Sequence, residues 1–374
     1  MSDQPLDGLL VLDMAQFLSG PSAALRLADL GARVIKVERP GGGDICRNLY
    51  LTDTDIGGDS TLFHAINRNK ESIALDYKLA ADRAMLLRLA ARADVVIQNF
   101  RPGVADRLGI GPDALRAHNP RLIVGTISGY GDCGPWADLP GQDLLAQALS
   151  GAMWLNGSAD DGPVPFGLSI ADMLAGHILT QAILAALVRR SIKGVGGHVE
   201  TSLLEAMVDF QFEVLTTHLN DGGRPPQRAR VRNAHAYLGA PYGVYRTADG
   251  WLALAMTPLP RLEALLDVRL DGDPFRDRDR LQAVLADRLA QRTSAQWIAL
   301  LRAQDIWCAP VADWPGLLEA EAFRRLDMLQ SVPTRDRSML MTRAAWRIDG
   351  QRAAGASAAP HVDEHGARIR AEFG

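Results

Sequence analysis

Residues 9–38 read LLVLDMAQFLSGPSAALRLADLGARVIKVE, and this stretch decides the fold class. The run from Leu9 to Asp13 is short, apolar and ends in a carboxylate, which is typical of a buried strand. A turn at residues 19–22 starts a run of helix formers, Gly31 ends it, and residues 34–38 predict the next strand. Strand, helix and strand in this order predict a parallel pair joined by a right-handed crossover. The turn lacks GxGxxG, so the pattern resembles a Rossmann unit without the dinucleotide fingerprint.

The composition is that of a soluble globular protein. The 374 residues are 47% hydrophobic and 22% charged, and this length suits about two domains. A formal net charge of −4 argues against a nucleic-acid-binding surface. The three cysteines are far apart, which favours a reducing cytoplasmic location over a disulfide framework or a zinc site. We expect no secretory signal at the N-terminus.

The rest of the chain continues the alternation of strands and helices. Strands are expected at residues 72–77, 94–98 and 121–127, with a helix at 80–93, and residues 199–219 read mainly as one long helix. Two glycines and two prolines at 221–226 predict a linker. We therefore expect a large Rossmann-like α/β domain at 1–220 and a smaller α+β domain at 221–325, followed by a polar, irregular segment at 326–374 with a weakly helical end.

A single carboxylate, Asp172, stands at the start of a long apolar run, 171–188. Because the run contains Asp172 and His177, we interpret it as a buried helix and expect no membrane span. Aspartate is favoured in the first turn of helices, where it satisfies free N–H groups. On local sequence alone, Asp172 is a helix cap or a functional carboxylate, and the cap is the commoner case.

Several stretches together resemble the family III CoA-transferases, also called the CaiB/BaiF family, which includes formyl-CoA transferase and the 2-methylacyl-CoA racemases. The matching motifs run in order through residues 5–325, and no single one is decisive. They are residues 5–13, 15–21, 28–38, 67–72, 99–103, 128–131, 140–151, 170–172, 202–206 and 308–311. The resemblance implies the fold of this family, in which the C-terminal segment returns to the large domain and two chains form an interlocked homodimer.

The resemblance also implies a mechanism, because Asp172 matches the catalytic aspartate of the family. In the transferases this carboxylate forms a mixed anhydride with the donor acyl group and then an aspartyl-CoA thioester, from which CoA passes to the acceptor acid. Covalent catalysis of this kind divides a difficult exchange into easier steps. It uses acyl-CoA and a carboxylic acid as substrates and needs no metal or redox cofactor. A carboxylate in the first turn of a helix can be both cap and nucleophile.

Further site residues follow from the resemblance, position by position. The pantetheine and nucleotide parts of CoA are assigned to Gln16, Phe17, Arg39, Leu75, Lys78, Asn99, Phe100, Arg101, Arg107, Gln142 and Asp143. The arginines and the lysine suit phosphates, which form charge-assisted hydrogen bonds. Arg232 and His235 are candidates for contacting the acceptor, and this pair favours a small di- or hydroxy-acid.

Other functions remain as alternatives. The racemase branch has a histidine followed by aspartate where this chain has Gln142 and Asp143, and glutamine cannot exchange a proton near neutral pH. This difference favours transfer over racemisation. An inactive CoA-binding subunit of a heteromer tends to lose the aspartate that this chain keeps at 172. An NAD-dependent dehydrogenase would need the missing glycine fingerprint.

Overall fold

The computed structural model describes residues 4–353 and 355–374, which form two compact units. Unit 1 contains residues up to 146, 169–210 and 326–374, and unit 2 contains residues 147–168 and 211–325. Residues 147–168 and 211–220 therefore belong to unit 2, although the sequence placed them in the first domain. The chain enters unit 2 twice. The single linker expected at 221–226 lies near the second entry, and nothing in the sequence indicated the first.

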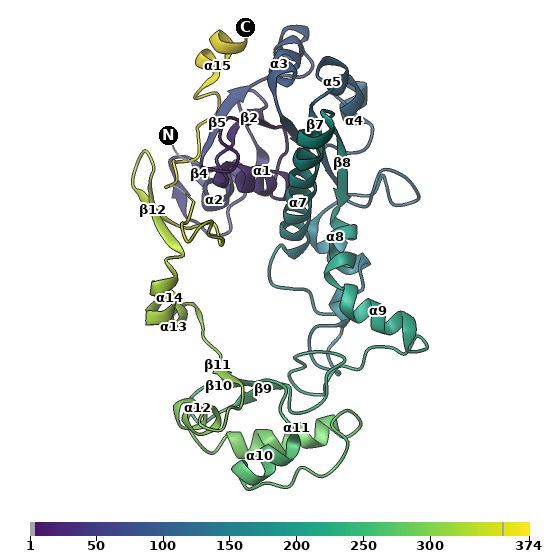
Figure 1. Ribbon diagram of the computed structural model, residues 1–374, viewed down its shortest axis with the longest axis vertical. Helices are drawn as coiled ribbons and strands as arrows, with labels where there is room; N and C mark the ends of the chain where they lie inside the picture. Colours follow the sequence, from purple (N-terminus) through teal and green to yellow (C-terminus); the bar gives the residue numbers. More distant parts are fainter. Residues whose placement is uncertain (1–3, 354) are drawn as a thin grey trace. The chain divides into compact units, whose positions relative to one another are not determined.

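A six-stranded parallel sheet forms the centre of unit 1 (Figure 1). Its strands lie in the order β5-β2-β1-β6-β7-β8, which, counted along the chain, is the 3-2-1-4-5-6 order of Rossmann folds. Every pair is parallel, and Val11 of β1 lies between Val34 and Val95 of the neighbouring strands. The strands are β1 (Leu10–Asp13), β2 (Arg33–Glu38), β5 (Lys70–Ala74), β6 (Val95–Gln98), β7 (Ile123–Ser128) and β8 (Gly197–Ser202).

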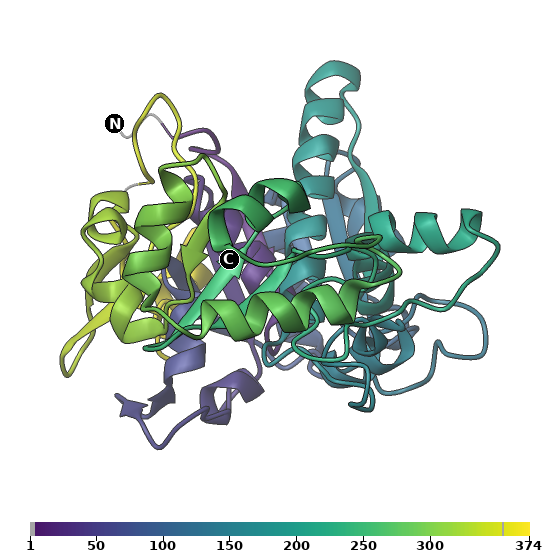
Figure 2. The same ribbon diagram turned by 90° about the horizontal axis from the view of Figure 1, so that it is seen from below.

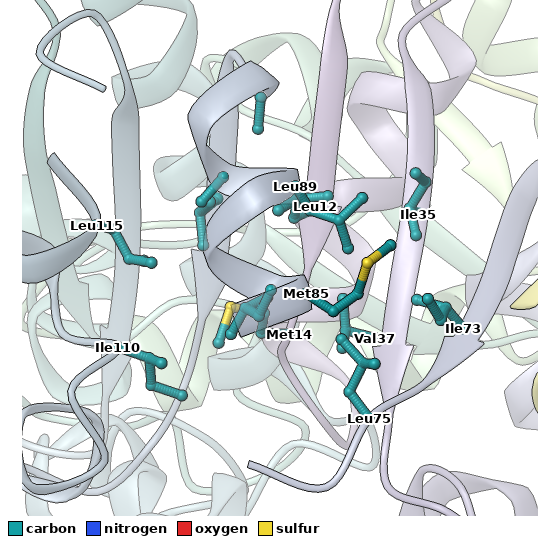
Figure 3. Close-up of a cluster of buried hydrophobic side chains, with 14 of the residues drawn as sticks. Leu12, Met14, Ile35, Val37, Ile73, Leu75, Met85, Leu89, Ile110 and Leu115 are labelled. Carbon is teal, nitrogen blue, oxygen red and sulfur yellow. The ribbon is translucent and has the colours of Figure 1, made fainter. Parts of the chain in front are cut away.

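The hydrophobic core of unit 1 lies between this sheet and a layer of helices. Helix α3 (Ala80–Arg92) presents Met85 and Leu89 to the side chains of β1, β2 and β5, as Figure 3 shows. Helices α5 (Pro112–His118) and α15 (Gly366–Phe373) complete the layer, and short α4 (Val104–Arg107) packs beside α5. Through α15 the C-terminal segment is part of this core.

Helices α1 (Ser19–Asp29), α7 (Ile170–Lys193) and α8 (Leu203–Phe210) form another packed group of unit 1. Helix α7 is long and apolar enough to cross a membrane by length and composition. It nevertheless packs against α1, α8, β7 and β8, and Figure 1 shows it along the sheet. These contacts are those of a core helix.

The long helix expected at 199–219 is wrong. Residues 197–202 form strand β8, which pairs with β7, and two separate helices follow, α8 and α9 (Phe212–Asn220). Val199 and Thr201 are β-branched and fit a pleated strand. The Ser202 side chain accepts a hydrogen bond from the Glu205 N–H and donates one to the Glu205 carboxylate, so the α8 helix starts only there.

The remaining elements of unit 1 are short. The segment after residue 325, which was expected to be irregular, contains the antiparallel pair β12 (Leu329–Pro333) and β13 (Ser338–Thr342). The others are the 3₁₀ helix η1 (Ile45–Asn48), β3 (Asp55–Ile56), β4 (Asp59–Ser60), α2 (Thr61–Asn67) and α6 (Asp143–Leu149), whose last residues are counted with unit 2.

Unit 2 is an α+β unit around its own hydrophobic core. The three-stranded antiparallel sheet β11-β10-β9 packs with the helices α10, α11 and α12, which are coloured green in Figure 2. Trp297 is fully buried there and donates its indole N–H to the Leu289 carbonyl at 2.7 Å. The elements are η2 (Ala152–Trp154), α9, β9 (Gly243–Arg246), β10 (Trp251–Leu254), α10 (Leu259–Leu266), α11 (Arg278–Leu289), α12 (Ser294–Arg302), β11 (Cys308–Pro310), α13 (Trp314–Glu319) and α14 (Glu321–Leu326).

Candidate active site

The loops after β1 and β6 are joined at the carboxyl edge of the parallel sheet. β1 and β6 are neighbours whose next strands lie on opposite sides, and ligands of open α/β sheets bind at this reversal. The Asn99 side chain accepts a hydrogen bond from the Gln16 N–H at 2.9 Å and donates one to the Gln16 carbonyl at 2.7 Å. These two bonds fix the backbone of Gln16 to the loop after β6.

Phe17, the next residue, has a backbone conformation that is rare for a side chain of its size. Its φ is 63°, in the left-handed region, which costs non-glycine residues about 1–2 kcal/mol. The Phe17 N–H donates a hydrogen bond to Asp44 Oδ1 at 3.1 Å, which holds this conformation. The Phe17 side chain remains 45% exposed, so the loop presents an aromatic ring to solvent beside the sheet edge.

A cluster of buried charges lies beneath this loop. Lys36 Nζ is 2.7 Å from Asp44 Oδ2 and 3.7 Å from Asp13 Oδ2, and it donates a hydrogen bond to the Ala15 carbonyl at 3.0 Å. Lys70 Nζ lies 2.8 Å from Asp13 Oδ2. Burial acts to raise the pKa of Asp13, but Lys36 and Lys70 outweigh it and hold that pKa below its usual value. The charges therefore compensate one another and tie the loop to β1 and β2.

The first turn of α7 is capped by a residue from another element. Ser169, at the N-cap position, makes no capping hydrogen bond with its side chain. Instead, Oδ1 of Asp143, the first residue of α6, accepts a hydrogen bond from the Asp172 N–H at 3.1 Å. The cap interpretation of Asp172 is therefore wrong, because Asp172 is the third residue of α7 and its own N–H is capped by Asp143.

The carboxylate of Asp172 is half-buried at this helix start. Burial is the main cause that raises its pKa to about 6, the negative charge of Asp143 raises it further, and a hydrogen bond with the Ser19 side chain opposes them. At neutral pH the group is mostly ionised, and it is more basic than an ordinary aspartate. A carboxylate with these properties suits nucleophilic or acid–base chemistry.

Close backbone contacts set the positions of Asp143 and Asp172. A Cβ added to Gly129, after β7, would lie 2.6 Å from the Cα of Gly141, so the loop before α6 contacts the end of β7 directly. A Cβ added to Gly176 of α7 would lie 2.8 Å from the Ser19 carbonyl oxygen of α1. Only glycine allows these approaches, and together they place Ser19 and Asp143 beside Asp172.

Comparisons with known proteins agree with this fold. The profile described as CoA-transferase family III matches residues 6–366. The chain is 34% identical to an acetyl-CoA:oxalate CoA-transferase of Acetobacter aceti, over 99% of this chain and 96% of that one. It is 32% identical to a succinyl-CoA:mesaconate CoA-transferase of Haloarcula hispanica, over 99% and 96% of the two chains. A crystal structure of a CaiB/BaiF family protein from Brucella suis superposes with a TM-score of 0.86 at 32% identity, covering 99% of this chain and 100% of that one.

The chain belongs to CoA-transferase family III. The profile and both relatives extend over nearly the whole chain, so the resemblance seen in the sequence motifs is confirmed. The Rossmann-like α/β fold is confirmed as well. The protein is a family III CoA-transferase.

The basic residues assigned to CoA lie at exposed positions of unit 1 of the transferase. Arg39 follows β2, and its Nε donates a hydrogen bond to the Gly43 carbonyl at 3.0 Å. Lys78 lies just before α3, whereas Arg101 and Arg107 follow β6, with Arg107 at the end of α4. All four side chains are exposed and accessible to an anionic ligand.

Leu75 does not fit a side-chain contact with CoA. Its side chain is fully buried in the core under α3, which leaves only its backbone for a ligand. Phe100, by contrast, is half-buried and contacts Tyr77 edge to face, with 5.9 Å between ring centroids. Gln142 is exposed directly before α6, and its carbonyl accepts hydrogen bonds from the N–H groups of the first turn.

Arg232 and His235 belong to unit 2 of the transferase. The Arg232 guanidinium stacks on the Trp251 ring at 4.3 Å from the centroid. His235 lies 3.9 Å from a Glu213 carboxylate oxygen and accepts a hydrogen bond from the Tyr237 N–H at 3.1 Å. Each of the two residues thus has its own neighbours within unit 2.

Three residues that shape the site were not expected there from the sequence: Ser19, Lys36 and Asp44. Lys36 is the residue for which a signal existed, because a lysine inside an otherwise apolar strand needs a buried partner. Ser19 is the first residue of α1 and Asp44 directly precedes η1, and nothing in the neighbouring sequence indicates the contacts that either residue makes. Among residues 4–353 and 355–374, no group of three or more metal-ligating side chains is placed to hold a metal ion.

Proposed function

We propose that this CoA-transferase moves CoA from an acyl-CoA donor to a short dicarboxylic acid, with Asp172 as the nucleophile. The observation that carries the proposal is Asp172 itself, a half-buried carboxylate with a raised pKa at the start of α7. The names of both relatives quoted above contain a dicarboxylic acid, oxalate or mesaconate, which supports this class of acceptor.

The proposed reaction proceeds through acyl derivatives of Asp172. The carboxylate attacks the donor thioester carbonyl, the C–S bond breaks, and a mixed anhydride and CoA thiolate form. The thiolate attacks the aspartyl carbonyl and releases the donor acid, which leaves an aspartyl-CoA thioester. The acceptor carboxylate displaces the thiolate to form a second anhydride. Finally, the thiolate attacks the acceptor carbonyl, which yields the new acyl-CoA and regenerates the carboxylate.

The geometry of α7 supports these steps. Each step passes through a tetrahedral oxyanion, and the partial positive charge of a helix N-terminus stabilises negative charge nearby. Asp172 lies in the first turn of α7, so the oxyanions formed at its carbonyl benefit from this charge. The hydrogen bond with Ser19 adds a polar contact to the same carboxylate.

We assign CoA to the carboxyl edge of the sheet. We assign the pantetheine arm to the Gln16–Phe17 loop and to Asn99 and Phe100, and the phosphates to the exposed side chains of Arg39, Lys78, Arg101 and Arg107. Gln142 and Asp143 complete this set beside Asp172. Arginine and lysine form charge-assisted hydrogen bonds with phosphate oxygens, which supports the assignment.

For the acceptor we assign Arg232 and His235, and for the assembly an interlocked homodimer. A dicarboxylic acid keeps one carboxylate free while the other reacts, and a guanidinium binds such a group well. Phe212 and Leu219 on α9 are 70% and 71% exposed, and covering such apolar side chains by a second copy of the chain is favourable.

A screen of donors and acceptors tests the proposal. The enzyme is incubated with acetyl-CoA or succinyl-CoA and with oxalate, mesaconate, glutarate or a long-chain fatty acid, and the products are read by mass spectrometry. We expect transfer to at least one dicarboxylate and none to the fatty acid. Transfer to the fatty acid alone contradicts the assigned acceptor class. Rapid α-deuterium uptake by a 2-methylacyl-CoA in heavy water, without transfer, contradicts the reaction itself.

The pH dependence of transfer follows from the pKa of Asp172. The nucleophile is the ionised carboxylate, and its pKa is raised to about 6, so the active form is lost as the pH falls through this value. We expect kcat/KM to be constant above about pH 6 and to fall tenfold per pH unit below it. This falling part of the pH profile is the acid limb. Initial rates between pH 3.5 and 8.5 measure this limb. A limb near pH 4 would show that Asp172 titrates like an exposed aspartate.

A further inference from the structure

Two carboxylates meet at the start of α7, and only one of them is needed as the nucleophile. Asp143 comes from α6, and its Oδ1 accepts the Asp172 N–H at 3.1 Å. The first N–H groups of a helix have no partner within it, and the adjacent Ser169 does not supply a side-chain cap. A neutral residue could cap α7 equally well, so the charge of Asp143 calls for a separate explanation.

The charge of Asp143 acts on the carboxylate of Asp172. It is the charged neighbour that contributes to raising the pKa of Asp172, after burial. Charged side chains of α1, α8 and β8 are not among the causes of this shift, and on β8 His198 Nδ1 lies 3.5 Å from a Glu200 carboxylate oxygen. Arg26 and Asp29 lie near the end of α1, about 10 Å and about 15 Å along the helix from Ser19 at 1.5 Å per residue. On α8, the Glu205 carboxylate accepts the Ser202 hydroxyl, and Asp209 is in the last turn.

We propose that Asp143 is a positioning residue for CoA transfer, which caps α7 through its hydrogen bond to Asp172 and favours the acylated state of Asp172 through its negative charge. This inference rests on the proposed function, since it concerns the same nucleophile. The two roles are separable, because hydrogen-bond acceptance needs only an oxygen, whereas repulsion needs the charge.

The chemistry of the intermediates explains the second role. The free Asp172 carboxylate is an anion beside the anion of Asp143. When its oxygen bonds to the donor carbonyl carbon and the C–S bond breaks, the negative charge leaves on the CoA thiolate. Asp172 is then a neutral anhydride, and it is still neutral as the CoA thioester. Acylation therefore removes one of two neighbouring like charges, and the repulsion that disfavours the free carboxylate favours its acyl forms.

The variants Asp143→Asn and Asp143→Ala separate the two roles. Asparagine keeps an acceptor oxygen for the Asp172 N–H and removes the charge, whereas alanine removes both. For Asp143→Asn we expect the acid limb of kcat/KM to move to lower pH. Hydroxylamine traps the acylated enzyme that is present at equilibrium with acyl-CoA. The trapped fraction should fall by about tenfold for each pH unit by which the acid limb moves. Asp143→Ala should also lower kcat further, because α7 loses its cap.

The control is Asp138→Asn, which removes one exposed carboxylate from the loop that leads into α6. We expect it to leave the acid limb and the trapped fraction unchanged. The variant Asp143→Glu restores the charge on a longer side chain, so it should keep the wild-type acid limb while kcat falls. This variant keeps the test decisive even if Asp143→Asn is unstable, because a purely structural role predicts no link between charge and acid limb.

The outcomes separate this proposal from the proposed function. Wild-type enzyme that transfers CoA without any trapped acyl-aspartate overturns the mechanism as a whole. Wild-type enzyme that is trapped at Asp172, with Asp143→Asn showing the same acid limb and the same trapped fraction, overturns the role of Asp143 alone. A shift of both quantities in Asp143→Asn, and of neither in Asp138→Asn, supports it.

Discussion

Asp172→Asn is expected to reduce CoA transfer by about four orders of magnitude or more, as removal of a covalent nucleophile does in other enzymes. The amide has nearly the shape of the carboxylate, so the packing of α7 changes little. It is not a competent nucleophile at the thioester carbonyl, and no anhydride forms. The variant should still bind CoA, because the residues assigned to CoA are intact. Initial rates with a competent donor and acceptor, together with calorimetric CoA titration, measure both effects.

The matched control for this variant is Asp113→Asn. Asp113 also lies in the first turn of a helix, α5, and it is exposed. Loss of its charge at a helix N-terminus should cost only about 0.3–1 kcal/mol of stability and no activity. Asp172→Ala guards against slow deamidation of the asparagine to aspartate. Transfer within tenfold of wild type by Asp172→Ala would rule out Asp172 as the nucleophile.

Lys36→Met is expected to lower the free energy of unfolding by about 3–5 kcal/mol, the usual cost of removing one partner from a buried ion pair. Methionine fills most of the volume of the lysine side chain, so the loss is mainly electrostatic. Asp44 and Asp13 would keep their buried charges without the cation that lies 2.7 and 3.7 Å from them. Urea denaturation at neutral pH, followed by circular dichroism, measures the change.

The same variant should weaken CoA binding. Asp44 accepts a hydrogen bond from the Phe17 N–H, which stabilises the conformation of the loop at the sheet edge. Lys36 in turn forms an ion pair with Asp44. The control is Lys193→Met at the exposed end of α7, which should leave CoA binding unchanged and change stability by no more than about 1 kcal/mol. A Lys36→Met protein as stable as the control would show that the buried charges contribute no net stability.

Local periodicity predicted the central elements of unit 1 well. The apolar runs of β1, β2, β6 and β7 and the helices α1 and α3 follow from residue pattern and from turn residues such as Gly31. The pattern of apolar residues predicted the wrong secondary structure where pairing with another strand decides it. Residues 197–202 form a strand because β7 offers free edge groups, and residues 329–342 form a hairpin although they are polar. The spacing of apolar residues does not indicate which strand has a free edge for pairing.

By itself, the sequence determined the family, the parallel Rossmann-like sheet and the single aspartate at the start of α7, because these depend on residue types in chain order. Only the tertiary structure decided what surrounds that aspartate. Ser19, Asp143 and Asp172 are far apart in the sequence and meet because glycines let their backbones approach closely. The pKa of a carboxyl group depends on burial and on charges within a few ångströms, and these distances exist only in the folded chain.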